Sequence, residues 1–123
     1  MAGQTTKGKT MITVVITTFE KTMKKFYNYN QNNSGGYFKE DKDRGIGKNV
    51  WIEADDVIQA NAIAESIGLY WDGVDIGEDC SCCGDRWTKL NENDKGQDEP
   101  DKEGYYSEDA YIHYADKRIE KVG

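Results

Sequence analysis

The chain has three cysteines, Cys80, Cys82 and Cys83, and they lie within four positions. Structural zinc sites use four thiolate or imidazole ligands arranged as a tetrahedron. Cys80 and Cys83 have the C-x-x-C spacing of a ligand pair, and Gly84 suits a tight turn after the second thiol. The single histidine, His113, would supply the fourth ligand if the C-terminal segment folded over the cysteines. Alternatively, two chains would share the metal across a dimer axis. Structural zinc is therefore one prediction for this segment.

Two other interpretations of the cysteine segment compete with zinc. In the first, the cysteines are small buried apolar residues in a turn, which Asp85 and Arg86 organise through charge-assisted hydrogen bonds, while Trp87 packs in the core. In the second, the thiols are redox-active. A reactive thiol needs positive charge nearby, and the acidic neighbours Glu78 and Asp79 disfavour it. The first interpretation is favoured, and the odd number of cysteines indicates free or metal-bound thiols in a reducing cytoplasm.

The remaining residues do not form a pattern typical of a reaction centre. Covalent hydrolysis needs a nucleophile beside a base, and His113 is the only imidazole in the chain. Acidic residues are so abundant that a solvated acidic surface explains any pair of neighbouring carboxylates. We therefore expect a protein without enzymatic activity.

A basic and aromatic stretch begins at Lys24 and Lys25 and continues to Tyr27 and Tyr29. Lysines for phosphates and tyrosines for base stacking are the components of a single-strand nucleic-acid site. The same residues also suit the edge strand of a sheet, where lysines protect the edge from aggregation. The edge-strand interpretation is favoured, and a weak binding surface at these four residues is the alternative.

Charge divides the chain into two unequal parts. The full chain of 123 residues has a formal net charge of -7, with 37% hydrophobic and 32% charged residues. The first fifty residues are basic and the remainder is strongly acidic, so general nucleic-acid binding is unlikely on electrostatic grounds. The length fits one domain, and no stretch is apolar enough to cross a membrane or to act as a secretory signal. We expect a cytoplasmic protein.

The helix is the clearest predicted element. Asp55 is the expected N-cap and Gly68 the expected left-handed C-cap, with apolar residues at helical spacing between them. Strands are predicted at residues 11–19, 23–29 (or as an extension of the first strand), 49–53, 86–90, 110–114 and 118–122. Flexible segments are predicted at residues 1–9, 30–48 and 91–104. This order indicates one α+β domain over residues 1–123, with one helix on a mostly antiparallel sheet of about five strands.

The segment from Trp51 to Trp87 resembles a family of small uncharacterised proteins of tailed bacteriophages. The resemblance is based on Ala60 to Tyr70, with the form Ala-Asn-x-Ile-Ala-Glu-x-Ile-Gly-Leu-Tyr, and on Asp79 to Trp87, with the form Asp-Cys-x-Cys-Cys-Gly-Asp-Arg-Trp. The cysteine motif is the specific part. The resemblance implies a bacteriophage origin and the cytoplasm of a bacterial host, and it carries over no catalytic residue.

Together these observations favour a phage accessory protein that acts by binding a host or phage protein, in host modulation or counter-defence. Long polar loops on a small scaffold suit such a role. One alternative is a virion or assembly component. Another is an acidic nucleic-acid mimic, in which residues 75–103 present carboxylates to a DNA-binding host enzyme. Homo-oligomers are compatible with all three hypotheses.

Overall fold

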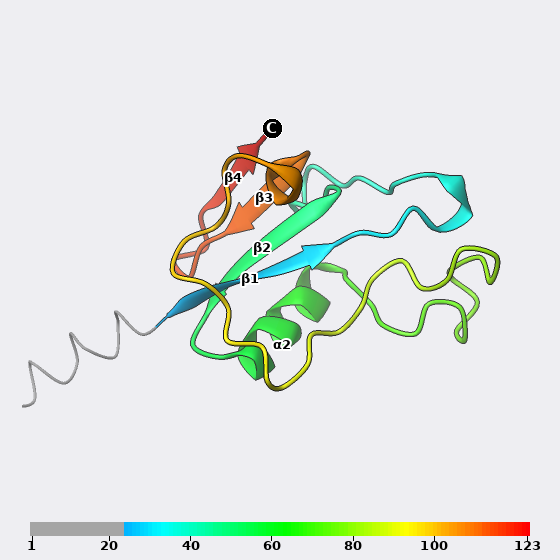
Figure 1. Ribbon diagram of the computed structural model, residues 1–123, viewed down its shortest axis with the longest axis horizontal. Helices are drawn as coiled ribbons and strands as arrows, with labels where there is room; N and C mark the ends of the chain where they lie inside the picture. Colours follow the sequence, from blue (N-terminus) through cyan, green and yellow to red (C-terminus); the bar gives the residue numbers. More distant parts are fainter. Residues whose placement is uncertain (1–23) are drawn as a thin grey trace, which may run out of the picture.

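The computed structural model describes residues 24–123 (Figure 1). The strand predicted at residues 11–19 and the flexible segment predicted at residues 1–9 lie outside the described residues. The elements, in chain order, are β1 (Lys25–Asn30), η1 (Ser34–Gly36), β2 (Asn49–Ala54), α2 (Val57–Ile67), η2 (Tyr105–Ser107), β3 (Ala110–His113) and β4 (Ile119–Val122). One α-helix and one sheet within residues 24–123 give the α+β class that the sequence predicts.

The sheet has the strand order β1-β2-β3-β4. β1 pairs with β2 and β3 pairs with β4 in antiparallel fashion, whereas β2 and β3 are parallel. The described residues therefore contribute four strands rather than about five, and the sheet is mixed. The parallel pair arises because α2 and the long loops return the chain to the start of β2 before β3 begins, as crossover connections do.

The helix packs one face against the sheet. Its N-cap is Asp56, whose carboxylate accepts the amide of Gln59 at 2.8 Å. The predicted cap, Asp55, lies one residue earlier, and its amide donates to the Gln59 side chain at 2.7 Å. Gly68 ends the helix at a φ of 116°, which confirms the predicted C-cap. Ala60 and Ala64 are fully buried, so their small side chains let the helix lie close to the strands.

Two apolar clusters lie on opposite faces of the sheet. Val50 and Ile52 belong to the cluster under α2, and Trp51 and Ile112 belong to the second cluster. The loop after residue 90 covers this second face. Gln97 makes two backbone hydrogen bonds with Phe26, at 2.8 and 2.9 Å, and the indole of Trp51 donates to a loop carbonyl. The domain therefore has three layers, with α2 on one face of the sheet and the loop on the other (Figure 1).

The segment predicted as a strand at residues 86–90 is not a strand. Its backbone groups bond to side chains and to a loop. The amide of Arg86 donates to the Asp79 carboxylate at 2.8 Å, and the amide of Leu90 donates to the Asn61 side chain at 3.2 Å. Backbone groups that find such partners need no neighbouring strand.

Candidate binding surface and the Arg86 cluster

The cysteine segment lies at the surface, at the end of the molecule opposite β4 (Figure 1). Cys80, Cys82 and Cys83 are all exposed, so the expectation of buried apolar cysteines is wrong. Cys80 and Cys82 are joined by a disulfide, which also differs from the expected free or metal-bound thiols. Cys83 keeps a free thiol, and its carbonyl accepts a hydrogen bond from the side-chain amide of Asn32 at 2.7 Å. The loop is therefore held by its backbone, and its sulfurs face solvent.

His113 does not join the cysteines. It lies on β3, where its Nε2 is 2.7 Å from the carbonyl of Gly45 and must carry the proton, because a carbonyl only accepts. Burial lowers the pKa of His113, and this hydrogen bond opposes the shift only in part. Residues 24–123 contain no group of three or more histidine, cysteine or acidic side chains placed to hold a metal. The structure does not assemble the predicted four-ligand site, and zinc shared between two chains stays a prediction.

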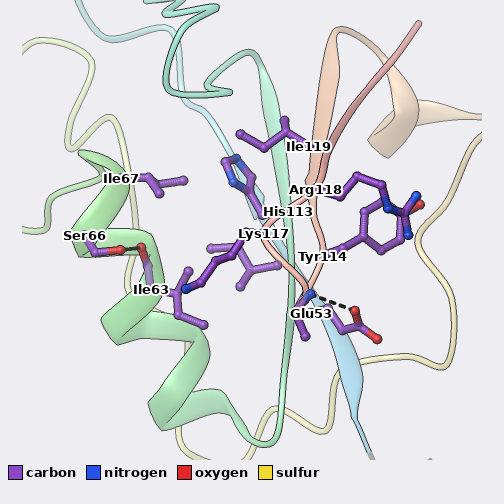
Figure 2. Close-up of a pocket in the computed structure, with 11 residues that line it drawn as sticks. Glu53, Ile63, Ser66, Ile67, His113, Tyr114, Lys117, Arg118 and Ile119 are labelled. Carbon is purple, nitrogen blue, oxygen red and sulfur yellow. Dashed lines mark hydrogen bonds between the residues drawn. The ribbon is translucent and has the colours of Figure 1, made fainter.

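A cavity of about 210 Å³ lies between α2 and the β3–β4 hairpin (Figure 2). Ile63 and Ser66 line it from the helix, and Ile119 and His113 line it from the hairpin. The hydroxyl of Ser66 donates to the carbonyl of Ile63 at 2.6 Å, and the imidazole is bonded to Gly45. Both polar groups are thus engaged with backbone carbonyls, and the cavity does not hold a serine–histidine pair.

The guanidinium of Arg86 is a deeply buried charged group. Its side chain is 1% exposed, and the Asp79 carboxylate beside it, 3.4 Å from Nε, is 0% exposed. Nη1 donates to the Gln31 side chain and to the carbonyl of Tyr37, both at 2.8 Å, and Nη2 donates to the carbonyl of Ser34 at 2.7 Å. We call these five residues the Arg86 cluster. It ties the cysteine segment to the loop between β1 and β2.

Asp79 carries the negative charge of the Arg86 cluster. Burial by itself would raise the pKa of its carboxyl, but the amide and guanidinium of Arg86 and the hydroxyl of Tyr70 outweigh burial and lower it. Burial and the neighbouring carboxylate raise the pKa of Tyr70 to about 12, and its hydroxyl donates to Asp79 at 2.8 Å. At neutral pH the Asp79 carboxyl is therefore ionised, and the Tyr70 phenol that donates to it is neutral.

The other predicted motif residues also make structural contacts. Asp85 accepts the amide of Val74 at 2.9 Å, and Trp87 is 3% exposed in the cluster under α2. The sequence predicted that Asp85 and Arg86 organise the turn through charge-assisted hydrogen bonds, and in the structure the charged partner of Arg86 is Asp79. The two acids flank the same loop, and their spacing from Arg86 does not reveal which one faces it.

The tyrosines of the predicted basic and aromatic surface are buried rather than exposed. Tyr27 and Tyr29 are buried in the cluster under α2, and the hydroxyl of Tyr29 donates to Asn61 at 2.8 Å. Lys24 is paired with Asp55, and Lys25 with Asp98. Because the rings face the core, they cannot stack on bases. β1 instead has its edge covered by the loop at Gln97.

Exposed aromatic rings gather at the start of β2, where three segments meet. Phe38, Tyr105 and Tyr106 are 39%, 60% and 43% exposed. The ammonium of Lys48 lies 5.2 Å from the ring centre of Phe38 and 5.3 Å from that of Tyr105. The rings of Tyr105 and Tyr106 pack edge to face at 5.0 Å. We call these four residues the aromatic patch, and large exposed rings of this kind mark interaction sites.

Buried polar groups hold the aromatic patch in place. Arg86 binds the carbonyl of Tyr37, next to Phe38, and the Gln31 side chain makes two hydrogen bonds with the backbone of Lys39. On the other side, the indole of Trp51 donates to the carbonyl of Tyr106 at 3.0 Å. The sequence has eight tyrosines, and no local pattern distinguishes the exposed Tyr105 from the buried Tyr29.

Comparison with known proteins adds a family but no function. Within residues 24–123, no helix is long and apolar enough to cross a membrane. No curated protein and no solved structure matches the chain. A family model described as a domain of unknown function, DUF7296, matches residues 24–123, which is most of the chain and all of its described part. The protein therefore belongs to the DUF7296 family.

Proposed function

We propose that the protein is a non-enzymatic accessory protein that binds another protein through the aromatic patch. The observation that carries this proposal is the exposure of three large rings in one place. Rings of this size bury much apolar area on binding, and tyrosine is enriched among the residues that dominate interface energies. Tyr105 is 60% exposed whereas Tyr29 is 1% exposed, so the fold buries some tyrosines and leaves those of the aromatic patch in solvent.

Preorganisation supports a binding role for the aromatic patch. Binding costs free energy when flexible loops must be ordered, and a patch that is already fixed avoids part of this cost. Arg86 fixes the segment that carries Phe38, and Trp51 fixes the segment that carries Tyr106. The rings are therefore presented on a scaffold of buried hydrogen bonds, although they lie on loops.

The resemblance to small tailed-bacteriophage proteins supports a bacterial cytoplasm as the place of action. The partner is then a host or phage protein, and the role is host modulation or counter-defence. The engagement of Ser66 and His113 with backbone carbonyls supports a non-enzymatic role, because the cavity between α2 and the β3–β4 hairpin offers no activated nucleophile.

A photocrosslinking experiment tests this proposal. A photoreactive phenylalanine analogue replaces Tyr105 in one variant and Ile58 in a control variant; Ile58 is exposed on α2, away from the patch. We expect the first variant to crosslink one protein of a bacterial host and the control to crosslink none. The captured protein, once purified, should bind the unmodified chain with 1:1 stoichiometry in calorimetry. Equal crosslinking from both positions, or no binding by the purified partner, would contradict the proposal.

A second candidate is the acidic nucleic-acid mimic, which the charge of the body favours. The described residues contain 22 acidic and 13 basic side chains. A mimic would compete with DNA for a host enzyme through residues 75–103, and its binding would fall steeply with salt. Replacing exposed acids of that segment, such as Asp75 and Glu78, by amides should then abolish competition, whereas Tyr105→Ala should leave it unchanged. The reverse result would favour the aromatic patch.

A further inference from the structure

The aromatic patch already holds one cation against its rings. The ring faces of phenylalanine and tyrosine attract cations through their quadrupole, and Lys48 lies within range of both Phe38 and Tyr105. The Lys48 side chain is only 16% exposed. The exposed parts of the two rings therefore face solvent rather than this partly buried lysine. They remain available to a second cation from outside.

Carboxylates pair with the lysines around the patch. Lys48 is paired with Glu108 at 3.1 Å, and Lys121 is paired with Asp109 at 3.0 Å. The described body as a whole has an excess of acids, with 22 acidic and 13 basic side chains. An anionic partner would be repelled from this surface, and a cationic partner would be attracted.

We propose that the aromatic patch binds a basic polypeptide segment, with an arginine guanidinium stacked on the exposed ring face of Tyr105. Arginine fits better than lysine because its planar group stacks on aromatic faces and is weakly hydrated. The rings of Tyr105 and Tyr106 meet edge to face at 85°, so a planar guanidinium on Tyr105 lies parallel to that ring alone. This inference rests on the proposed function, because it names the partner class of the same surface.

Chemical-shift mapping by NMR with synthetic peptides tests the inference. The probe is a soluble peptide of Arg-Gly-Ser repeats, and two control peptides carry lysine or glutamate in place of arginine. We expect the arginine peptide to shift amide signals around residue 38, residue 48 and η2 (Tyr105–Ser107). The lysine peptide should bind several-fold more weakly, and the glutamate peptide should cause no shift. Raising the salt from about 50 to about 500 mM should weaken binding several-fold.

Variants make the result specific to the patch. Tyr105→Ala should weaken binding of the arginine peptide about tenfold, and Tyr105→Phe should retain it, because the ring face remains. Ile58→Ala, on the exposed face of α2, is the matched control and should bind like the wild type. Shifts confined to residues 91–101, or equal binding of the lysine peptide, would overturn the inference. Self-association that removes the patch from solvent, seen by sedimentation, would also overturn it.

The two proposals fail in different ways. A host protein that crosslinks at position 105, combined with no response to the arginine peptide, would leave the proposed function intact and reject a basic partner. An arginine peptide that binds in the expected place would support the basic partner, and the crosslinked host protein should then present arginine at its contact site.

Discussion

At one end of the molecule, the guanidinium of Arg86 is 1% exposed and is surrounded by oxygens of Asp79, Gln31 and two backbone carbonyls. In the sheet, Ile52 and Ile112 are 0% exposed and belong to the apolar clusters. Apolar packing loses free energy in proportion to the atoms removed. A buried ion pair behaves differently, because removal of one partner strands the charge of the other. Mutations in the two regions should therefore have different effects on stability. The loss should grow stepwise with the number of atoms removed in the sheet, and it should be large for any change of Arg86 in the Arg86 cluster.

The largest expected effect is that of Arg86→Ala. This change leaves the Asp79 carboxylate buried without its cation and leaves three oxygens without their donor, so we expect a loss of about 3–5 kcal/mol in the free energy of unfolding. Urea denaturation measures it. Arg44→Ala, at a side chain that is 64% exposed, is the control and should change stability by less than about 0.5 kcal/mol. The double variant Arg86→Ala/Asp79→Ala should recover part of the lost stability. Similar losses of unfolding free energy for Arg86→Ala and Arg44→Ala would contradict the prediction that the Arg86 cluster is highly sensitive to mutation.

Truncation of Ile52 tests the graded response of the sheet. Ile52→Val should cost about 0.5–1.5 kcal/mol and Ile52→Ala about 2–5 kcal/mol, because each lost methyl group leaves a larger cavity. The matching series in the Arg86 cluster is Arg86→Lys and Arg86→Ala. Lysine keeps the charge but cannot reach the three oxygens that the forked guanidinium binds, so it should lose most of what alanine loses. A wild-type midpoint for Arg86→Lys in urea would show that charge alone holds the Arg86 cluster.

Acid should weaken the Arg86 cluster before it weakens the apolar sheet. The pKa of Asp79 is lower in the folded chain than in the unfolded chain. Its stabilising contribution is therefore complete above the ordinary carboxyl pKa of about 4 and is lost as the pH falls through the lower folded value. The stability difference between wild type and Asp79→Asn should be large at pH 7 and should shrink at pH 3. Asp116→Asn, at an exposed carboxylate, should show a small difference at both pH values, and a constant difference for Asp79→Asn would contradict this prediction.

The sequence predicted the elements whose signals are local. The strand-forming residues Tyr111 and Ile112 and the cap at Gly68 lie within a few residues of what they specify, and these elements were found. The parallel pairing of β2 with β3 joins residues 61 positions apart, and no local pattern encodes it. The side chains of the candidate site were harder to place for the same reason. Arg86 meets Gln31 across 55 positions, and only the fold brings them together.

The smallest expected effect on stability is that of Cys83, which belongs to the motif that the sequence analysis singled out as a candidate metal or redox site. Cys83 is exposed, so Cys83→Ser should change the free energy of unfolding by less than about 0.5 kcal/mol in urea denaturation. Arg86 lies three positions later in the same motif and should cost several times more. The cysteines before Gly84 are therefore exposed, whereas Arg86 after it is a buried member of an ion pair. A loss for Cys83→Ser as large as that for Arg86→Ala, reproduced in the wild type by a zinc chelator, would show that the sulfurs hold the loop through a metal.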